Sequence, residues 1–135
     1  MGFDFQFANE SGPEAPASGP GVWYRFTSWE MGWVNGILLN TGAAKDPNAF
    51  TTPGWEPTKD SVDLYKFKSN DGWLITPEEC RHIASRLRKF VAENEVGSYL
   101  SFFDDDPPKE EVEGWLTSFA DYCENAAENE GFKVW

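Results

Sequence analysis

The sequence has few of the side chains on which most enzyme active sites depend. It contains one histidine, His82, and two cysteines, Cys80 and Cys123. On a helix, His82 and Cys80 would point roughly 160° apart, so they cannot pair as base and nucleophile or share a metal ion. The sequence also lacks a Gly-rich phosphate loop, a Gly-x-Ser-x-Gly turn and a His-Glu-x-x-His motif. We therefore expect no catalytic residues, no metal site and no cofactor, and we predict that the protein is not an enzyme. An enzyme that uses two carboxylates as acid and base is the alternative, but the sequence locates no such pair.

The histidine and the cysteines have simpler structural explanations. His82 lies four residues after Glu78 and four before Arg86, a spacing that is typical of a solvent-exposed helix face. Cys80 and Cys123 fall on the apolar stripes of two expected helices, where a free thiol behaves as a small hydrophobic group. A disulfide between the helices is the alternative. However, the first seven residues lack the pattern of a secretory signal, so we expect a cytoplasmic protein with free thiols.

Basic residues and long apolar runs are also scarce. The chain has 11 Lys and Arg against 23 Asp and Glu, which gives a net charge of −12. The acidic excess is greatest in residues 101–135, which hold 10 acidic and 2 basic residues. Because nucleic-acid binding depends on Lys and Arg, we expect no nucleic acid as a partner. No apolar run approaches the roughly 18 residues of a membrane helix, so we expect no membrane partner either. Another protein with a basic surface fits this charge better.

The best-marked element is a helix over residues 77–91. Thr76 can cap its first free amides, Pro77 fits the first helical position, and Glu79 can complete a capping box. Six apolar residues recur at spacings of three and four and fall on one stripe. They are Cys80, Ile83, Ala84, Leu87, Phe90 and Val91. This stripe requires a sheet or a second helix to cover it.

A second helix is expected in the last third of the chain. It should begin at Pro107 or Pro108, with Asp105 or Asp106 as its cap, and end at Gly131. Its apolar residues also share one stripe. They are Val112, Trp115, Leu116, Phe119, Cys123 and Ala126.

The rest of the sequence predicts short antiparallel strands. Apolar alternation and turn motifs place them in several segments. These are residues 2–7, 22–27, a hairpin of 29–34 and 37–40 around Asn35-Gly36, a second hairpin of 62–68 and 73–75, and 132–135. Residues 97–103 fit either a strand or a buried connector. The sequence therefore predicts a single α+β domain over residues 1–135, with an antiparallel sheet of hairpins, two helices packed on one face and a short C-terminal strand.

Two segments show no periodic pattern. Residues 9–21 have the composition of a flexible linker, rich in Gly, Pro, Ser and Ala. Residues 41–60 form a long loop that contains Phe50 and Trp55. A loop of this length is either a contact surface or a segment that its aromatic rings hold against the core.

One face of the second helix carries a row of carboxylates. Five acidic residues fall within roughly 80° of one another, opposite the apolar stripe. They are Glu110, Glu113, Asp121, Glu124 and Glu128, named here the carboxylate row. Like charges at these spacings repel, and no Lys or Arg occurs between Lys109 and Lys133 to relieve them. The row is therefore either a binding surface for a basic partner or a solvated acidic face.

Three aspartates precede this helix. Asp104, Asp105 and Asp106 supply carboxylates that suit a divalent cation. Their spacing is not that of an EF-hand loop, and the two prolines that follow favour helix capping. We assign Asp104 and Asp105 to the candidate binding surface and predict no metal site.

Seven tryptophans add a second candidate surface. Trp73 and Trp115 are expected in the core, whereas Trp29 and Trp55 are expected to be partly exposed and available to a partner. The carboxylate row and the lack of any catalytic set favour a small acidic protein-binding module of the inhibitor, immunity or counter-defence kind. Its partner would present a basic surface, such as one that otherwise binds nucleic acid. The alternative is a small-molecule binding module with an aromatic pocket between the sheet and residues 41–60.

Overall fold

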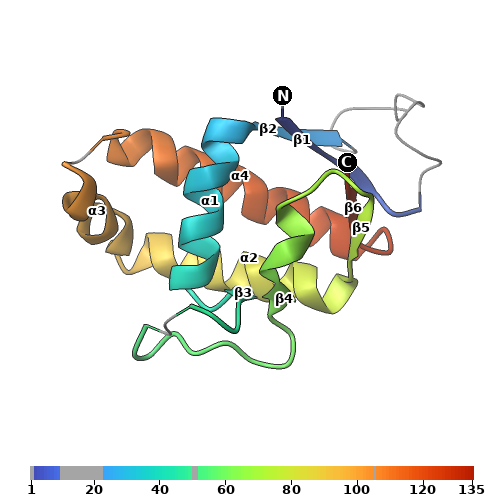
Figure 1. Ribbon diagram of the computed structural model, residues 1–135, viewed down its shortest axis with the longest axis horizontal. Coiled ribbons are helices and arrows are strands. Elements are labelled where there is room, and N and C mark those ends of the chain that lie inside the picture. Colours follow the sequence, from blue (N-terminus) through green and yellow to red (C-terminus); the bar gives the residue numbers. More distant parts are fainter. Residues whose placement is uncertain (1, 10–22, 50–51, 105) are drawn as a thin grey trace.

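Four α-helices, a four-stranded antiparallel sheet and a two-stranded parallel sheet are the main elements in the part of the chain that the structure describes (Figure 1). The computed structural model describes residues 2–9, 23–49, 52–104 and 106–135. The order of elements is β1 (Gly2–Phe7), β2 (Trp23–Thr27), α1 (Ser28–Asn40), β3 (Ala44–Lys45), β4 (Val62–Asp63), the 3-10 helix η1 (Leu64–Phe67), β5 (Trp73–Ile75), α2 (Pro77–Ala92), α3 (Glu95–Leu100), the 3-10 helix η2 (Ser101–Phe103), α4 (Lys109–Ala127) and β6 (Phe132–Val134). The expected α+β class is confirmed. The predicted linker falls almost entirely outside the described residues.

Helices α2 and α4 run side by side in opposite directions (Figure 1). The predicted start of α2 is confirmed: the Thr76 hydroxyl accepts from the Glu79 amide at 3.2 Å, and the Glu79 carboxylate accepts from the Thr76 amide at 2.9 Å. Leu87 on α2 and Phe119 on α4 are fully buried. The start of α4 differs from the prediction, because Pro108 is its cap residue and makes no side-chain cap.

Helix α1 replaces the hairpin that the Asn35-Gly36 pair predicted. A second capping box starts it, in which the Thr27 hydroxyl accepts from the Glu30 amide and the Glu30 carboxylate accepts from the Thr27 amide. This signal was present in the sequence, and its two hydrogen bonds outweigh the local turn preference of Asn-Gly. Glycine suits position 36 because the Tyr99 hydroxyl oxygen lies 2.6 Å from where a Cβ atom would stand.

The four strands of the sheet follow the order β2-β1-β6-β5. The predicted hairpin of residues 62–68 and 73–75 is therefore wrong, because β5 pairs with β6 and β4 pairs in parallel with β3. After β4 the chain turns into η1, which buries both Leu64 and Phe67. Their spacing of three matches one turn of a 3-10 helix, whereas a strand would place them on opposite faces.

Strands β1 and β6 join the first and last described segments of the chain. Phe5 lies opposite Val134. One residue past the end of β6, the Trp135 amide donates to the Asp4 carbonyl at 2.8 Å, and the Asp4 amide donates to the Trp135 carbonyl at 3.1 Å. The Asn70 side-chain amide donates to the carbonyl of Trp135 at 2.6 Å and to the carbonyl of Gly2 at 3.0 Å. These contacts fix the two segments against the turn that precedes β5.

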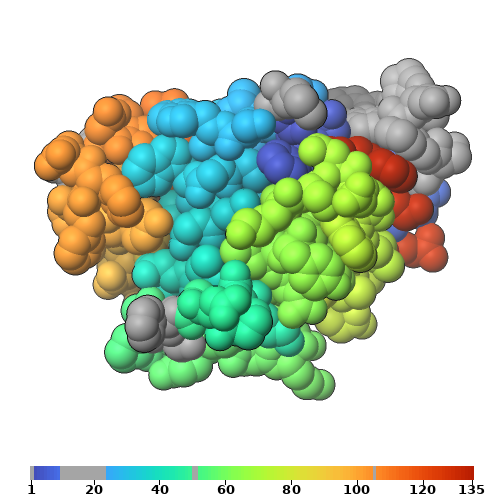
Figure 2. Space-filling view, viewed as in Figure 1, coloured from blue at the N-terminus to red at the C-terminus, as the bar shows by residue number. Residues whose placement is uncertain are grey.

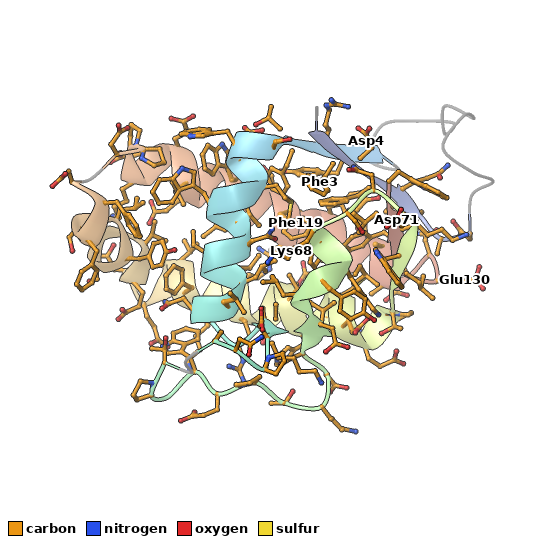
Figure 3. All side chains as sticks on the ribbon, in the orientation of Figure 1. Phe3, Asp4, Lys68, Asp71, Phe119 and Glu130 are labelled. Atoms are coloured by element: carbon orange, nitrogen blue, oxygen red, sulfur yellow. The ribbon has the colours of Figure 1, made fainter. Side chains whose placement is uncertain are left out.

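Aromatic side chains connect the sheet to the helices. The ring centroid of Phe5 lies 5.1 Å from that of Phe132, 5.4 Å from that of Phe119 and 5.9 Å from that of Phe67. All four rings are fully buried, and Figure 3 shows Phe119 in the interior of the molecule. Burial of a large apolar side chain stabilises the fold by about 1.5–3 kcal/mol, so this cluster determines how β1, β6, η1 and α4 pack.

Residues 97–103, which fitted two interpretations, are helical. They form the end of α3 and the 3-10 helix η2. The core position expected for Trp73 is wrong, since this side chain is 37% exposed and packs edge-on against the exposed Tyr65 at 4.9 Å. Trp115 is half-buried against the core. None of the helices in the described ranges is both long and apolar enough to cross a membrane.

Candidate functional site

The carboxylate row is less free than the sequence suggested. Arg88 on α2 reaches across to α4, where its Nε donates to Glu124 at 3.2 Å and its terminal NH2 group donates to Glu124 and Asp121. Glu113 pairs with Lys109 at 3.7 Å. The expectation that nothing relieves the row is therefore wrong, because Arg88 of α2 and Lys109 at the start of α4 both supply counter-charge. The two carboxylates raise the pKa of Arg88 through these hydrogen bonds.

The ends of the row remain solvent-exposed. Glu110 and Glu128 are exposed, and neither forms an ion pair with another described residue. Asp104 is exposed in a left-handed backbone conformation with φ of 60°, while Asp105 falls outside the described residues. Within the ranges that the structure describes, no three His, Cys, Asp or Glu side chains lie close enough together to hold a metal ion.

A second candidate surface is made of exposed aromatic rings on α1, α3 and η2. Three of its rings are unusually exposed for their size: Phe102 is 85%, Trp29 is 57% and Phe103 is 46% exposed. The half-buried Trp33 and Tyr99 lie between them. We call these five residues the aromatic face. Figure 2 shows α1 and the α3–η2 segment forming adjoining parts of one surface, at the left of the view.

Ring contacts hold the aromatic face together. The Trp33 and Phe103 rings meet edge to face at 5.0 Å, and the Tyr99 ring lies 5.4 Å from Phe103. Trp29 meets Trp115 of α4 edge to face at 5.6 Å. Each such pair contributes about 0.5–1.5 kcal/mol beyond burial, so the rings are positioned before any partner arrives.

Two open grooves flank the ridge that Tyr99 and Phe103 form. One has a volume of about 430 Å³ and lies over Gly32 between Trp29 and Phe103. The other has a volume of about 330 Å³ and extends past Phe102. The residues that line the second groove are Asn40, Thr52, Phe90, Glu95, Ser98, Tyr99, Phe102 and Phe103. Both aromatic grooves thus lie beside α3, and the second also touches residues 41–60 at Thr52. No residue of the described sheet strands lines either groove, so neither lies between the sheet and residues 41–60 as the alternative hypothesis expected.

Trp55 behaves as a contact between the long loop and the core. Its ring is half-buried, lies edge-on to Phe90 at 5.8 Å, and has the Lys89 ammonium 4.6 Å from its centroid. These contacts support the interpretation that the loop is held against the core at this residue. Phe50, the other ring in that interpretation, is outside the described residues.

His82 is half-buried and bonded, so its expected position on a solvated helix face is wrong. Its Nε2 lies 3.2 Å from the carbonyl oxygen of Gly42 and 3.1 Å from the Ser61 hydroxyl. Arg86, one turn later, donates to the carbonyl of Thr41 at 2.9 Å. Both carbonyls follow the C-terminus of α1, where the helix dipole favours donors and cations. Burial lowers the pKa of His82.

The pair of His82 and Ser61 does not resemble an activated nucleophile. The Ser61 side chain is buried, and its hydroxyl donates to the carbonyl of Gly42 at 2.6 Å. A hydroxyl whose proton is engaged in this way is not positioned for transfer to the imidazole. Cys80 and Cys123 are free, buried thiols, and burial raises the pKa of Cys80 to about 12. Neither thiol is an accessible thiolate at neutral pH.

The sequence indicated only part of the aromatic face. The exposed position expected for Trp29 is confirmed. The sequence predicts a strand at Trp33 and leaves Phe102 and Phe103 open between a strand and a buried connector. The available signal was the Phe-Phe run itself: an apolar pair directly before an acidic turn, in a segment without an apolar stripe to join.

No family model, curated protein or solved structure matches this chain. The function is therefore inferred from the geometry and charge of the chain itself.

Proposed function

We propose that this chain is a small acidic protein-binding module of the inhibitor, immunity or counter-defence kind, and that it binds a partner with a basic surface. The observation that carries the proposal is the aromatic face, on which Phe102, Trp29 and Phe103 are all substantially exposed. Large exposed apolar patches on soluble domains mark interaction sites, and tryptophan is among the residues enriched at binding hot spots.

The charge around the aromatic face indicates the chemistry of the partner. Helices α1, α3 and η2 contain Glu30 and Glu95 but no Lys or Arg. Asp104 directly follows Phe103, and the exposed Glu110 lies in the first turn of the neighbouring α4. A surface with apolar anchors and surrounding carboxylates favours a partner that presents Lys or Arg around an apolar centre.

The carboxylate row has a narrower role in this proposal than the sequence alone suggested. Arg88 holds Asp121 and Glu124, so these two carboxylates mainly connect α2 to α4. Lys109 holds Glu113, so this carboxylate mainly stabilises the first turns of α4. Glu110 and Glu128 remain available for long-range attraction. Such exposed charges mainly increase the association rate and are screened by salt.

A small-molecule ligand is the second candidate. The groove past Phe102 has a volume of about 330 Å³, near the lower end of ligand sites, and combines rings with the polar side chains of Glu95, Asn40 and Ser98. However, the groove is open at the surface beside other exposed rings. A protein partner could cover the groove and these rings together, which a small molecule could not.

Binding measurements with surface variants test the proposal. The partner would be captured by cross-linking in extracts of the source cells and then purified. Its affinity would be measured for wild type, for the Trp29→Ser/Phe102→Ser double variant, and for Tyr65→Ser as a control that removes a half-exposed ring elsewhere. We expect the double variant to lose about tenfold or more in affinity, while the control binds as wild type does.

Two outcomes would overturn the proposal. The first is equal affinity of the double variant and wild type for the purified partner. The second is a concentration-dependent dimer of the protein alone that the double variant abolishes, which would assign the aromatic face to self-association. A Glu110→Gln/Glu128→Gln variant should reduce mainly the association rate and make its salt dependence shallower. An unchanged salt dependence would remove these two residues from the binding surface.

A further inference from the structure

The groove over Gly32 has an open floor with aromatic walls. A Cβ atom on Gly32 would meet no atom within 4 Å, so the helix backbone itself forms the floor. Trp29, Trp33, Tyr99 and Phe103 line the sides, and the groove has a volume of about 430 Å³. We infer that this groove receives the side chain of an arginine from the partner protein. The inference rests on the proposed function and specifies the chemistry of its partner.

The walls of the groove favour a cation. Aromatic ring faces attract cations by about 0.5–1 kcal/mol at exposed sites and by about 2 kcal/mol when water is excluded. No Lys or Arg occurs on α1, α3 or η2 to occupy the groove from within. The acidic side chains nearest along the chain are Glu30, beside Trp29, and Asp104, beside Phe103. The groove is therefore mainly aromatic at its walls, carries no positive charge on the helices that line it, and belongs to a protein with a net charge of −12.

A neighbouring part of the chain shows the same kind of contact. The ammonium of Lys89 lies 4.6 Å from the centroid of the Trp55 ring, which packs against Phe90. Phe90 also lines the second groove, on the other side of the Tyr99 ridge. In this molecule a basic side chain thus already lies over the half-buried ring of Trp55. The ring of Trp29 is 57% exposed, so it can accept a comparable contact from a partner.

Arginine fits the groove better than an aliphatic side chain or lysine. Its guanidinium is planar and weakly hydrated, so it can stack on a ring with less loss of hydration than an ammonium group. Its methylene groups can cover the bare backbone at Gly32 while the charged end stays at the open, solvent-exposed edge of the groove. An aliphatic side chain would bury apolar surface but would gain nothing from the ring faces or from the net charge of −12.

Peptide titrations test the inference without the natural partner. The seven tryptophan indole N–H signals would be followed by NMR, with those of Trp29 and Trp33 assigned through Trp→Phe variants. The probes are acetyl-Gly-Arg-Gly-amide, the same peptide with citrulline, which has the shape of arginine without its charge, and the same peptide with leucine. We expect saturable shifts of the Trp29 and Trp33 signals with the arginine peptide and about fivefold weaker binding of the citrulline peptide.

Two glycine variants give a matched comparison. Gly32→Leu fills the groove, while Gly114→Leu adds the same side chain to open space on α4. Binding of the arginine peptide should be lost in the first variant and kept in the second. Gly32→Ala serves if Gly32→Leu fails to fold, and it should weaken binding without abolishing it.

Several results would overturn the inference. They are equal binding of the citrulline or leucine peptide, undiminished binding to the Gly32 variants, and shifts confined to tryptophans other than Trp29 and Trp33. Any of these results would leave the protein-binding role of the aromatic face intact if the Trp29→Ser/Phe102→Ser variant still loses its partner. Failure of the proposed function is seen separately, as an unchanged affinity of that double variant.

Discussion

Arg88 on α2 holds Glu124 on α4 through both carboxylate oxygens, and the same guanidinium also binds Asp121. A planar guanidinium suits this two-point contact, which an ammonium group cannot reproduce. The contact joins the two longest helices at a point where α4 would otherwise carry neighbouring, unrelieved negative charges.

Replacement of Arg88 should therefore destabilise the protein modestly. Arg88→Met should lower the free energy of unfolding by about 0.2–1 kcal/mol per ion pair, because these pairs are partly solvated. The loss should shrink in high salt, which already screens the pairs in wild type. Urea unfolding at low and high salt would measure both effects. Arg81→Met is the control, since Arg81 is exposed on the same helix and forms no ion pair with a described residue. Equal losses in the two variants would contradict the prediction.

The buried stripe of α2 should be far more sensitive. Leu87→Ala should lower the free energy of unfolding by about 2–5 kcal/mol, because it leaves a cavity beneath a fully buried side chain. Glu110→Ala, at an exposed position of α4, should change it by less than about 0.5 kcal/mol. Thermal or denaturant unfolding of the two variants gives the comparison. Small and equal effects would mean that the assigned packing of α2 is wrong.

Two glycines in α1 should respond in opposite ways to the same substitution. Gly32→Ala adds a methyl group in open space and should stabilise the helix by up to about 1 kcal/mol. Gly36→Ala would place its methyl group 2.6 Å from the Tyr99 hydroxyl oxygen, so this ring must move and the gain should be lost. Adding Tyr99→Phe removes the hydroxyl that the new methyl group would meet, so it should restore the stability of the Gly36→Ala variant. Thermal unfolding of the three variants tests the pair, and equal stabilisation by both alanines would count against the close approach of Tyr99.

His82 should make stability depend on pH as the pH falls below the ordinary imidazole pKa of about 6.5. Burial lowers the pKa of His82 below its ordinary value, so the unfolded chain binds a proton at a higher pH than the folded protein does. The free energy of unfolding should consequently fall as the pH decreases below that ordinary value. His82 is the sole histidine, and most carboxylates titrate lower, so the slope can be assigned to it.

His82→Gln should remove this slope, because the amide can still donate to the carbonyl of Gly42 without titrating. Unfolding curves at several pH values would test this prediction, together with an NMR titration of the imidazole. An imidazole pKa at or above the ordinary value, or the same slope in the Gln variant, would contradict it.

The elements that sequence patterns predicted correctly are those with independent local signals. For α2, the Thr76–Glu79 capping box, Pro77 at the first turn and the apolar stripe all agreed. Helix α1 had a capping box of the same kind, but its Asn35-Gly36 pair is the strongest local signal for a hairpin, and that signal misled the assignment. Helix α1 has no clearly separated polar face, so apolar spacing alone did not identify it.

Contacts between distant segments explain the remaining differences. Arg88 and Glu124 are 36 residues apart, and nothing in the α4 sequence shows that Asp121 and Glu124 are paired. His82 reaches Gly42 across 40 residues. The aromatic face likewise depends on α1 and η2 lying side by side, which no local pattern of Trp33 or Phe103 encodes. Single residues such as Trp29 could be predicted, whereas the surface they form could not.

The pairing of β1 with β6 affects the order in which the chain can fold. Strand β1 lies between β2 and β6, so the sheet cannot close until residues 132–134 have left the ribosome. Until then, the edge of β1 that β6 will cover has no partner, and Phe5 lacks its contact with Phe132. Contacts of such long sequence separation slow folding because loop closure comes before any stabilising contact. The nascent chain should therefore depend on its own helices, or on a chaperone, to protect this strand during synthesis.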